Sequence, residues 1–157
     1  MSKFQLKNLF KAAYDLMLVF LQFFIISLHF FQWEFLPQKQ IIQASPFSYF
    51  LGFLIIIIAF IIMLVSIKDL GRNLSPFPRP INDSNLVTTG IYRFTRHPMY
   101  YSLIFISFGV FIIKLSFYYL FLTISLALII KFKIALEEQY LNNKFKNYLL
   151  YKNEVKY

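Results

Sequence analysis

The stretch that most restricts the fold of this chain is the apolar run from Phe47 to Ile67, which contains FLIIIIAFIIMLV and no charged residue. At ~1.5 Å per helical residue, a run of this length crosses a hydrocarbon layer ~30 Å thick. Of the 157 residues 59% are hydrophobic and only four are glycine. A soluble core cannot absorb so much apolar surface in so short a chain, so we expect a single membrane domain over 1–157.

Three further apolar blocks run from about Tyr14 to Phe31, from Met99 to Ile113 and from Leu115 to Ile130. The last two are short, and Lys114 alone separates them, which predicts a tight helical hairpin over 98–130. We expect flanking residues, or local thinning of the bilayer, to compensate for the short length of these two helices. The predicted fold is therefore an all-α polytopic membrane protein with about four transmembrane helices.

The distribution of Lys and Arg predicts the orientation. The N-terminal tail carries three, segment 68–98 carries five and the tail from Lys131 carries six, whereas the opposite loops carry only Lys39 and Lys114. This imbalance of 14 against 2 predicts a protein of the cytoplasmic membrane with both termini in the cytoplasm. The same charges flank apolar blocks instead of forming one basic face, which argues against nucleic acid as a partner. The absence of cysteine excludes disulfides and thiolate metal sites, and we expect no metal.

Segment 68–98 is expected to be a cytoplasmic loop, since the three prolines of SPFPRP keep it extended. At its end, Pro98 disfavours α geometry at His97 but suits the first turn of a helix. We therefore expect the third apolar helix to begin at Pro98 with His97 as its N-cap. Free N–H groups around 99–101, together with Arg96 and His97, predict an anion site at the membrane surface. Attachment to lipid phosphates is the alternative, and it is strongest for Arg93.

The tail 131–157 is expected to form an amphipathic helix lying on the cytoplasmic surface, because its apolar residues fall at helical spacing. These residues are Leu141, Phe145, Tyr148 and Leu149. Lys152, further along the tail, is expected to lie outside any site.

Glu137 and Glu138 form the only adjacent acidic pair in the chain. A solvated helix face explains them poorly, because only Lys133 lies four residues away and in the weaker orientation. An antiparallel hairpin would place Pro98 and Ile130 at the same membrane face, and hence the glutamates near the anion site. Such a site suits a molecule that carries both a negative and a positive charge, and the site would be accessible from the apolar part of the bilayer.

The run from Leu70 to Val155 resembles the isoprenylcysteine carboxyl methyltransferase family, which is grouped with the phospholipid N-methyltransferases. The shared pattern is Gly-x-Tyr-x-x-x-Arg-His-Pro-x-Tyr, followed by Glu-Glu and by Phe-x-x-Tyr-x-x-Tyr. The matching residues are Gly90, Tyr92, Arg96, His97, Pro98, Tyr100, Glu137, Glu138, Phe145, Tyr148 and Tyr151. The resemblance implies S-adenosylmethionine as cofactor and a lipid-like or prenyl-like acceptor that enters from the membrane.

The resemblance also implies roles for these residues. The cofactor-binding set is Gly90, Tyr92, His97, Pro98, Tyr100, Glu137 and Glu138. The cofactor's carboxylate would meet the helix end at His97, and its ammonium would meet Glu137 or Glu138. Arg96 and Glu138 are the predicted catalytic residues: Arg96 would meet the cofactor or an anionic group of the acceptor, and a glutamate would take the proton that an amine acceptor must lose.

Ser102 and Lys146 depart from the family pattern, which commonly has glycine at both positions. The short chain leaves open a small acceptor cavity or one completed by a second subunit of a homo-oligomer. Membrane sterol reductases, which bind NADPH, carry a similar Arg-His-Pro element, and a non-catalytic membrane protein that has kept the fold is a further alternative. The pair Glu137-Glu138, and Ser102-Leu103 in place of Gly-Glu, favour the methyltransferase.

Overall fold

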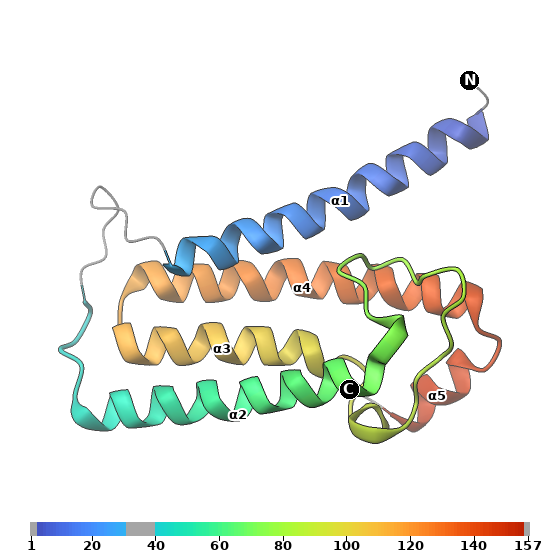
Figure 1. Cartoon of the computed structure of the whole chain (residues 1–157). Coiled ribbons are helices and arrows are strands. Elements are labelled where there is room, and N and C mark those ends of the chain that lie inside the picture. The colour runs from blue at the N-terminus through green and yellow to red at the C-terminus, as the bar shows by residue number, and fades with distance from the viewer. Residues whose placement is uncertain (1–2, 31–39, 156–157) are drawn as a thin grey trace.

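The computed structural model describes residues 3–30 and 40–155, and it shows helices, turns and no strand over these ranges. The elements are α1 (Lys3–Phe30), α2 (Pro46–Leu70), the 3-10 turns η1 (Gly71–Asn73) and η2 (Gly90–Arg93), α3 (Pro98–Lys114), α4 (Phe117–Lys144) and α5 (Tyr148–Glu154). Figure 1 shows α2, α3 and α4 side by side, with α1 leaving the bundle at an angle. The predicted all-α fold is confirmed.

Three of these helices are long and apolar enough to cross a membrane. Their spans are Leu9–Phe30, Pro46–Asn73 and Phe117–Lys144, and α3 is a shorter apolar helix of 17 residues. At ~1.5 Å per residue α3 is about 25 Å long, slightly less than the hydrocarbon thickness. The chain is therefore a polytopic integral membrane protein, as expected from the composition.

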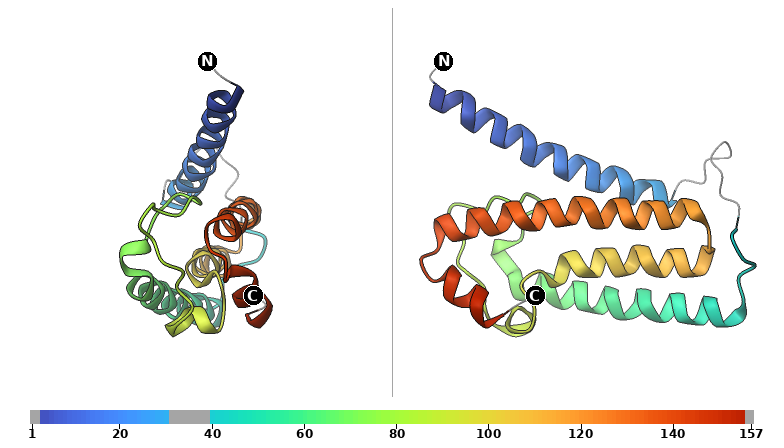
Figure 2. Two further views of the ribbon diagram at one scale, coloured as in Figure 1. Left: turned by 90° about the vertical axis from the view of Figure 1, so that its right-hand side faces the viewer. Right: turned by 180° about the vertical axis from the view of Figure 1, so that it is seen from behind.

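The hairpin between α3 and α4 turns at the predicted place. Lys114 is the last residue of α3, and Leu115 takes the left-handed conformation at φ 44° and ψ 47°. Ser116 then caps α4, with its hydroxyl accepting a bond of 3.3 Å from the N–H of Tyr118. The two helices run antiparallel, so the start of α3 and the far end of α4 lie at one end of the bundle (Figure 2).

Helices α2 and α3 approach closely through two glycines. A Cβ atom on Gly52 would lie 2.8 Å from the carbonyl oxygen of Gly109, and one on Gly109 would lie 2.9 Å from that of Gly52. Larger side chains would push the backbones apart, and small residues commonly allow such contacts between membrane helices. Away from this contact α2 carries exposed apolar side chains such as Phe50 and Phe53, as expected of a lipid-facing helix.

The C-terminal segment is arranged differently from the single surface helix that the apolar spacing predicts. Helix α4 continues to Lys144, so both glutamates lie on its last turns, and α5 starts again after a break at residues 145–147. Tyr148 is buried while Leu149 is exposed. The difference arises because Tyr148 packs in a cluster with other aromatic residues of the segment and with Leu86 of the loop, instead of facing lipid.

Candidate functional site

A pocket lies where the start of α3, the end of α4, α5 and the loop after η1 meet. Its volume is about 80 Å³, and the loop supplies one wall with Pro78, Arg79 and Leu86. Among the predicted site residues, those that line it are Tyr92, Arg96, His97, Tyr100 and Glu137, with Phe145, Tyr148 and Tyr151 as aromatic walls. The antiparallel hairpin thus brings the Arg-His-Pro element and the acidic pair together, as predicted from the sequence.

His97 occupies the N-cap position of α3, where its side chain forms no capping hydrogen bond, and Pro98 is the first residue of the helix, as predicted from the proline. The N–H groups of Tyr100 and Tyr101 both donate to the carbonyl of His97 over 3.1 Å. Two of the three N–H groups expected to face an anion are therefore bonded within the helix itself. The His97 side chain is buried and stacks on the ring of Tyr100, with 5.8 Å between centroids.

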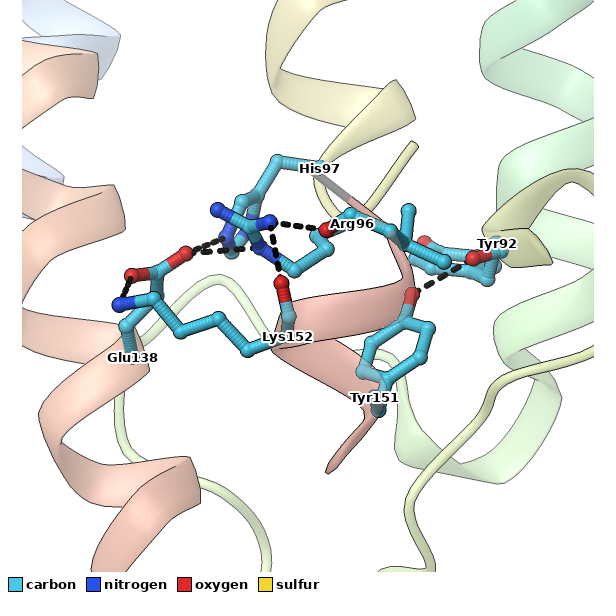
Figure 3. A network of polar contacts seen from close by, with 7 residues as sticks. Tyr92, Arg96, His97, Glu138, Tyr151 and Lys152 are labelled. Carbon is cyan, nitrogen blue, oxygen red and sulfur yellow. Dashed lines mark hydrogen bonds and ion pairs between the residues drawn. The ribbon is translucent and has the colours of Figure 1, made fainter. Parts of the chain in front are cut away.

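The two adjacent glutamates have different surroundings, and Glu138 is the one that pairs with basic side chains. Its Oε1 lies 3.0 Å from Arg96 Nε and 3.4 Å from His97 Nε2, and its Oε2 lies 2.6 Å from Lys152 Nζ (Figure 3). Opposite charges at this range keep a carboxylate ionised. Lys152 is thus part of this network, contrary to the expectation that it lies outside; its partners are too far away in sequence for spacing to reveal them.

Arg96 fastens α5 to the rest of the site. Its Nη1 donates to the backbone carbonyls of Val155 and, over 3.4 Å, of Lys152, at the C-terminal end of α5. A cation there satisfies carbonyls that the helix leaves free. The Tyr151 hydroxyl adds a bond of 2.6 Å to the Tyr92 carbonyl (Figure 3).

Glu137 faces the pocket and keeps one oxygen free. Its Oε2 is buried and has no hydrogen-bond partner in the described part of the structure; the same holds for the hydroxyl of Tyr148, which lines the same pocket. His97, Tyr100 and Lys133 lie close enough to interact electrostatically with this carboxyl. Since leaving a buried acceptor unbonded costs ~1–3 kcal/mol, such atoms are rare and mark a place for a donor.

Gly90 is required by the backbone and does not line the pocket. Its φ of +62° is in the left-handed region, and a Cβ atom would lie 2.0 Å from Asp69 Oδ2. That oxygen accepts a bond of 2.8 Å from the N–H of Ile91. Asp69 therefore anchors η2, which carries Tyr92 into the pocket.

Burial also controls the protonation of the pocket tyrosines that lie outside the spans. It is the main cause that raises the pKa of Tyr92 and Tyr148; Glu137 raises the pKa of both further, and Glu138 also raises that of Tyr148. Burial raises the pKa of Tyr151 from 10.0 to about 12. These hydroxyls therefore keep their protons at neutral pH and remain hydrogen-bond donors.

Sequence reasoning missed Lys133, which is 1% exposed. Its Nζ donates to Gln22 Oε1 over 2.5 Å and to the Pro76 carbonyl over 3.0 Å, and lies 5.2 Å from the centroid of the Tyr100 ring. The signal in the sequence is a lysine one turn before Glu137, a spacing that indicates no more than a weak ion pair.

Comparison with known families gives one result. Residues 47–148 match the family model described as phospholipid methyltransferase. The matched range runs from α2 to the first residue of α5, so it includes the Arg-His-Pro element and both glutamates and leaves out α1. Comparisons with curated proteins and with solved structures give no match.

Proposed function

Because the chain belongs to the phospholipid methyltransferase family, a family of membrane methyltransferases, we propose that it transfers a methyl group from S-adenosylmethionine to an amphiphilic acceptor in the membrane. The observation that carries this proposal is the free, buried Oε2 of Glu137 in a pocket at the start of α3. A buried carboxylate oxygen with no donor fits the ammonium of the cofactor's methionine end, because a charged donor forms the stronger hydrogen bonds there.

The two glutamates then take different roles, which the sequence alone left open. We propose that Glu137 holds the ammonium, while Glu138 and Arg96, bonded to each other and to α5, position the pocket. His97 and Tyr100, stacked at the start of α3, would line the methionine end. This assignment replaces the direct catalytic roles first expected for Arg96 and Glu138.

The size of the pocket bears on how the cofactor enters. Sites for small molecules usually measure ~300–1,000 Å³, against about 80 Å³ here. Admission of a molecule as large as S-adenosylmethionine therefore requires one wall to move. We propose that the extended loop over 74–87 moves, because it is the wall that contains no helix.

The chemistry needs little acid–base help from the protein. When bound, S-adenosylmethionine supplies an electrophilic methyl group on a sulfonium. A carboxylate acceptor needs only alignment by the aromatic walls, whereas an amine acceptor must first lose a proton. Neither glutamate is free for that proton in this proposal, because Glu137 would hold the cofactor's ammonium and Glu138 already has three donors.

We further propose that this end of the bundle faces the cytoplasm, with both chain termini on that side, because 14 of the 16 Lys and Arg residues lie on that side. The acceptor's reactive group would then meet the cofactor at the depth of lipid headgroups while its tail stays in hydrocarbon. Reporter fusions at Met1 and Tyr157 test this orientation. A reporter that is active only on the side of the membrane opposite the cytoplasm contradicts it.

Binding of labelled S-adenosylmethionine and of NADPH to the purified protein in detergent tests the activity. We expect saturable binding of S-adenosylmethionine and none of NADPH; the opposite result would support the reductase alternative. With the cofactor bound, a long-chain amphiphile should be methylated and its tail-less, water-soluble analogue should not. Equal turnover of both would refute delivery from the membrane.

A further inference from the structure

Helix α1 carries three polar residues that recur every seven residues, in a stretch where Ser27 is the only other polar residue. They are Asp15, Gln22 and His29. Residues at this spacing lie along one face of a helix. Each contacts another element: Asp15 contacts Tyr140, Gln22 contacts Lys133, and His29 Nε2 lies 2.7 Å from Ser107 Oγ. We call Asp15, Gln22 and His29 the polar seam.

Asp15 connects α1 to the pocket loop. It is 4% exposed, and its Oδ2 lies 3.2 Å from Arg79 Nη2. The Tyr140 hydroxyl donates to Asp15 Oδ1 over 3.2 Å, and the Arg79 guanidinium lies 5.3 Å from the Tyr140 ring centroid. Arg79 lines the pocket, so a residue of α1 holds a residue of the pocket wall.

Gln22 connects α1 to the same loop through Lys133. Its Oε1 accepts from Lys133 Nζ, which also donates to the Pro76 carbonyl. A buried ammonium in a membrane helix requires such acceptors. The two contacts therefore hold the loop at Pro76 and at Arg79, three residues apart.

From these contacts we infer that α1 is a positioning element for the pocket: Asp15 and Gln22 hold the extended loop in its closed position, to which it returns after moving to admit the cofactor, although α1 lies outside the matched family range. This inference rests on the proposed function for the identity of the ligand. It gives α1 a task beyond anchoring the chain in the membrane, and it assigns Asp15 and Gln22 as positioning residues.

A double-mutant cycle tests the coupling. In the full-length protein, Asp15→Asn and Arg79→Gln are measured singly and together by equilibrium binding of labelled S-adenosylmethionine. We expect Asp15→Asn to raise Kd by up to about 5-fold, because the Arg79 side chain is 48% exposed and such pairs contribute ~0–1 kcal/mol. In the Arg79→Gln background the same change should have little further effect, because the two residues act through one contact.

Two further readouts separate positioning from a general loss of structure. Turnover at saturating cofactor should be unchanged in Asp15→Asn, since the wall affects binding and not the chemical step. Hydrogen exchange of the backbone over 75–87 should increase in Asp15→Asn and in Gln22→Leu. Asp83→Asn is the matched control: it makes the same change on an exposed residue of this loop that forms no ion pair in the described structure.

The inference is overturned if Asp15→Asn and Gln22→Leu match Asp83→Asn in Kd and in loop exchange, or if the effects of Asp15→Asn and Arg79→Gln simply add. If the wild-type protein does not bind S-adenosylmethionine, the proposed function fails instead. Loop exchange alone then decides whether α1 holds the wall.

Discussion

Replacing Glu138 should loosen α5, because Glu138 pairs with both Arg96 and Lys152. The Glu138 and Arg96 side chains are 14% and 12% exposed, and their atoms lie 3.0 Å apart. Breaking a buried pair by removing one partner costs ~3–5 kcal/mol. In Glu138→Gln the amide oxygen still accepts one bond and Arg96 keeps its carbonyl partners. We therefore expect the local stability of α5 to fall by about 2–3 kcal/mol.

Hydrogen exchange of the backbone amides of α5, followed by mass spectrometry in detergent, measures this change. A loss of 2–3 kcal/mol corresponds to ~30–150-fold faster exchange at about 1.4 kcal/mol per factor of ten. Lys152→Gln should accelerate exchange less than about 5-fold, because the Lys152 side chain is 42% exposed and such pairs contribute ~0–1 kcal/mol.

The control for this experiment is Glu154→Gln, at the exposed end of α5, which forms no ion pair in the described structure. Exchange in α5 that is the same in Glu138→Gln and in this control would refute the role given to Glu138. It would mean that Tyr151 and the aromatic cluster hold α5 without the ion pairs.

Two other predictions concern the same end of the bundle. Gly90→Ala should lower Tm clearly more than Gly71→Ala, because both residues have positive φ but only Gly90 has a neighbour, Asp69, where the Cβ atom would lie; equal shifts would contradict the clash. Because the raised pKa of Tyr151, about 12 against 10.0, favours the protonated form in the folded state, stability is fully present below pH 10 and falls as the pH rises toward 12. Tyr151→Phe should make this fall in Tm smaller, and an unchanged pH profile would show that another group causes it.

The sequence predicts the membrane layout because its strongest signals are local. Unbroken apolar runs, a proline at position 98 and a single lysine between two blocks determine where helices begin and turn, whatever lies around them. The same hairpin brings His97 and Glu137 to one pocket. The C-terminal segment is harder to predict from the sequence, because the break at 145–147 depends on packing against Leu86, a residue far away in the chain.

The division of labour between Glu137 and Glu138 could not be read from the sequence. Adjacent helical residues point about 100° apart, and which one faces the pocket depends on how α4 is rotated against α3. The partners of Glu138 are Arg96, His97 and Lys152, which lie 42, 41 and 14 residues away. The polar seam on α1, in contrast, follows a seven-residue spacing in the sequence, but spacing alone does not identify the residues that it contacts.

The most direct test of the site is the affinity of Glu137→Gln for S-adenosylmethionine and for an analogue that lacks the α-amino group, both compared with wild type by equilibrium dialysis. Loss of a charged hydrogen bond of ~1.5–3 kcal/mol should raise Kd for S-adenosylmethionine about 10–150-fold. The analogue, which has no ammonium to offer, should bind the wild-type and variant proteins equally. Wild-type affinity of Glu137→Gln for S-adenosylmethionine, with α5 exchange unchanged, would contradict the assignment of Glu137 as the residue that holds the cofactor.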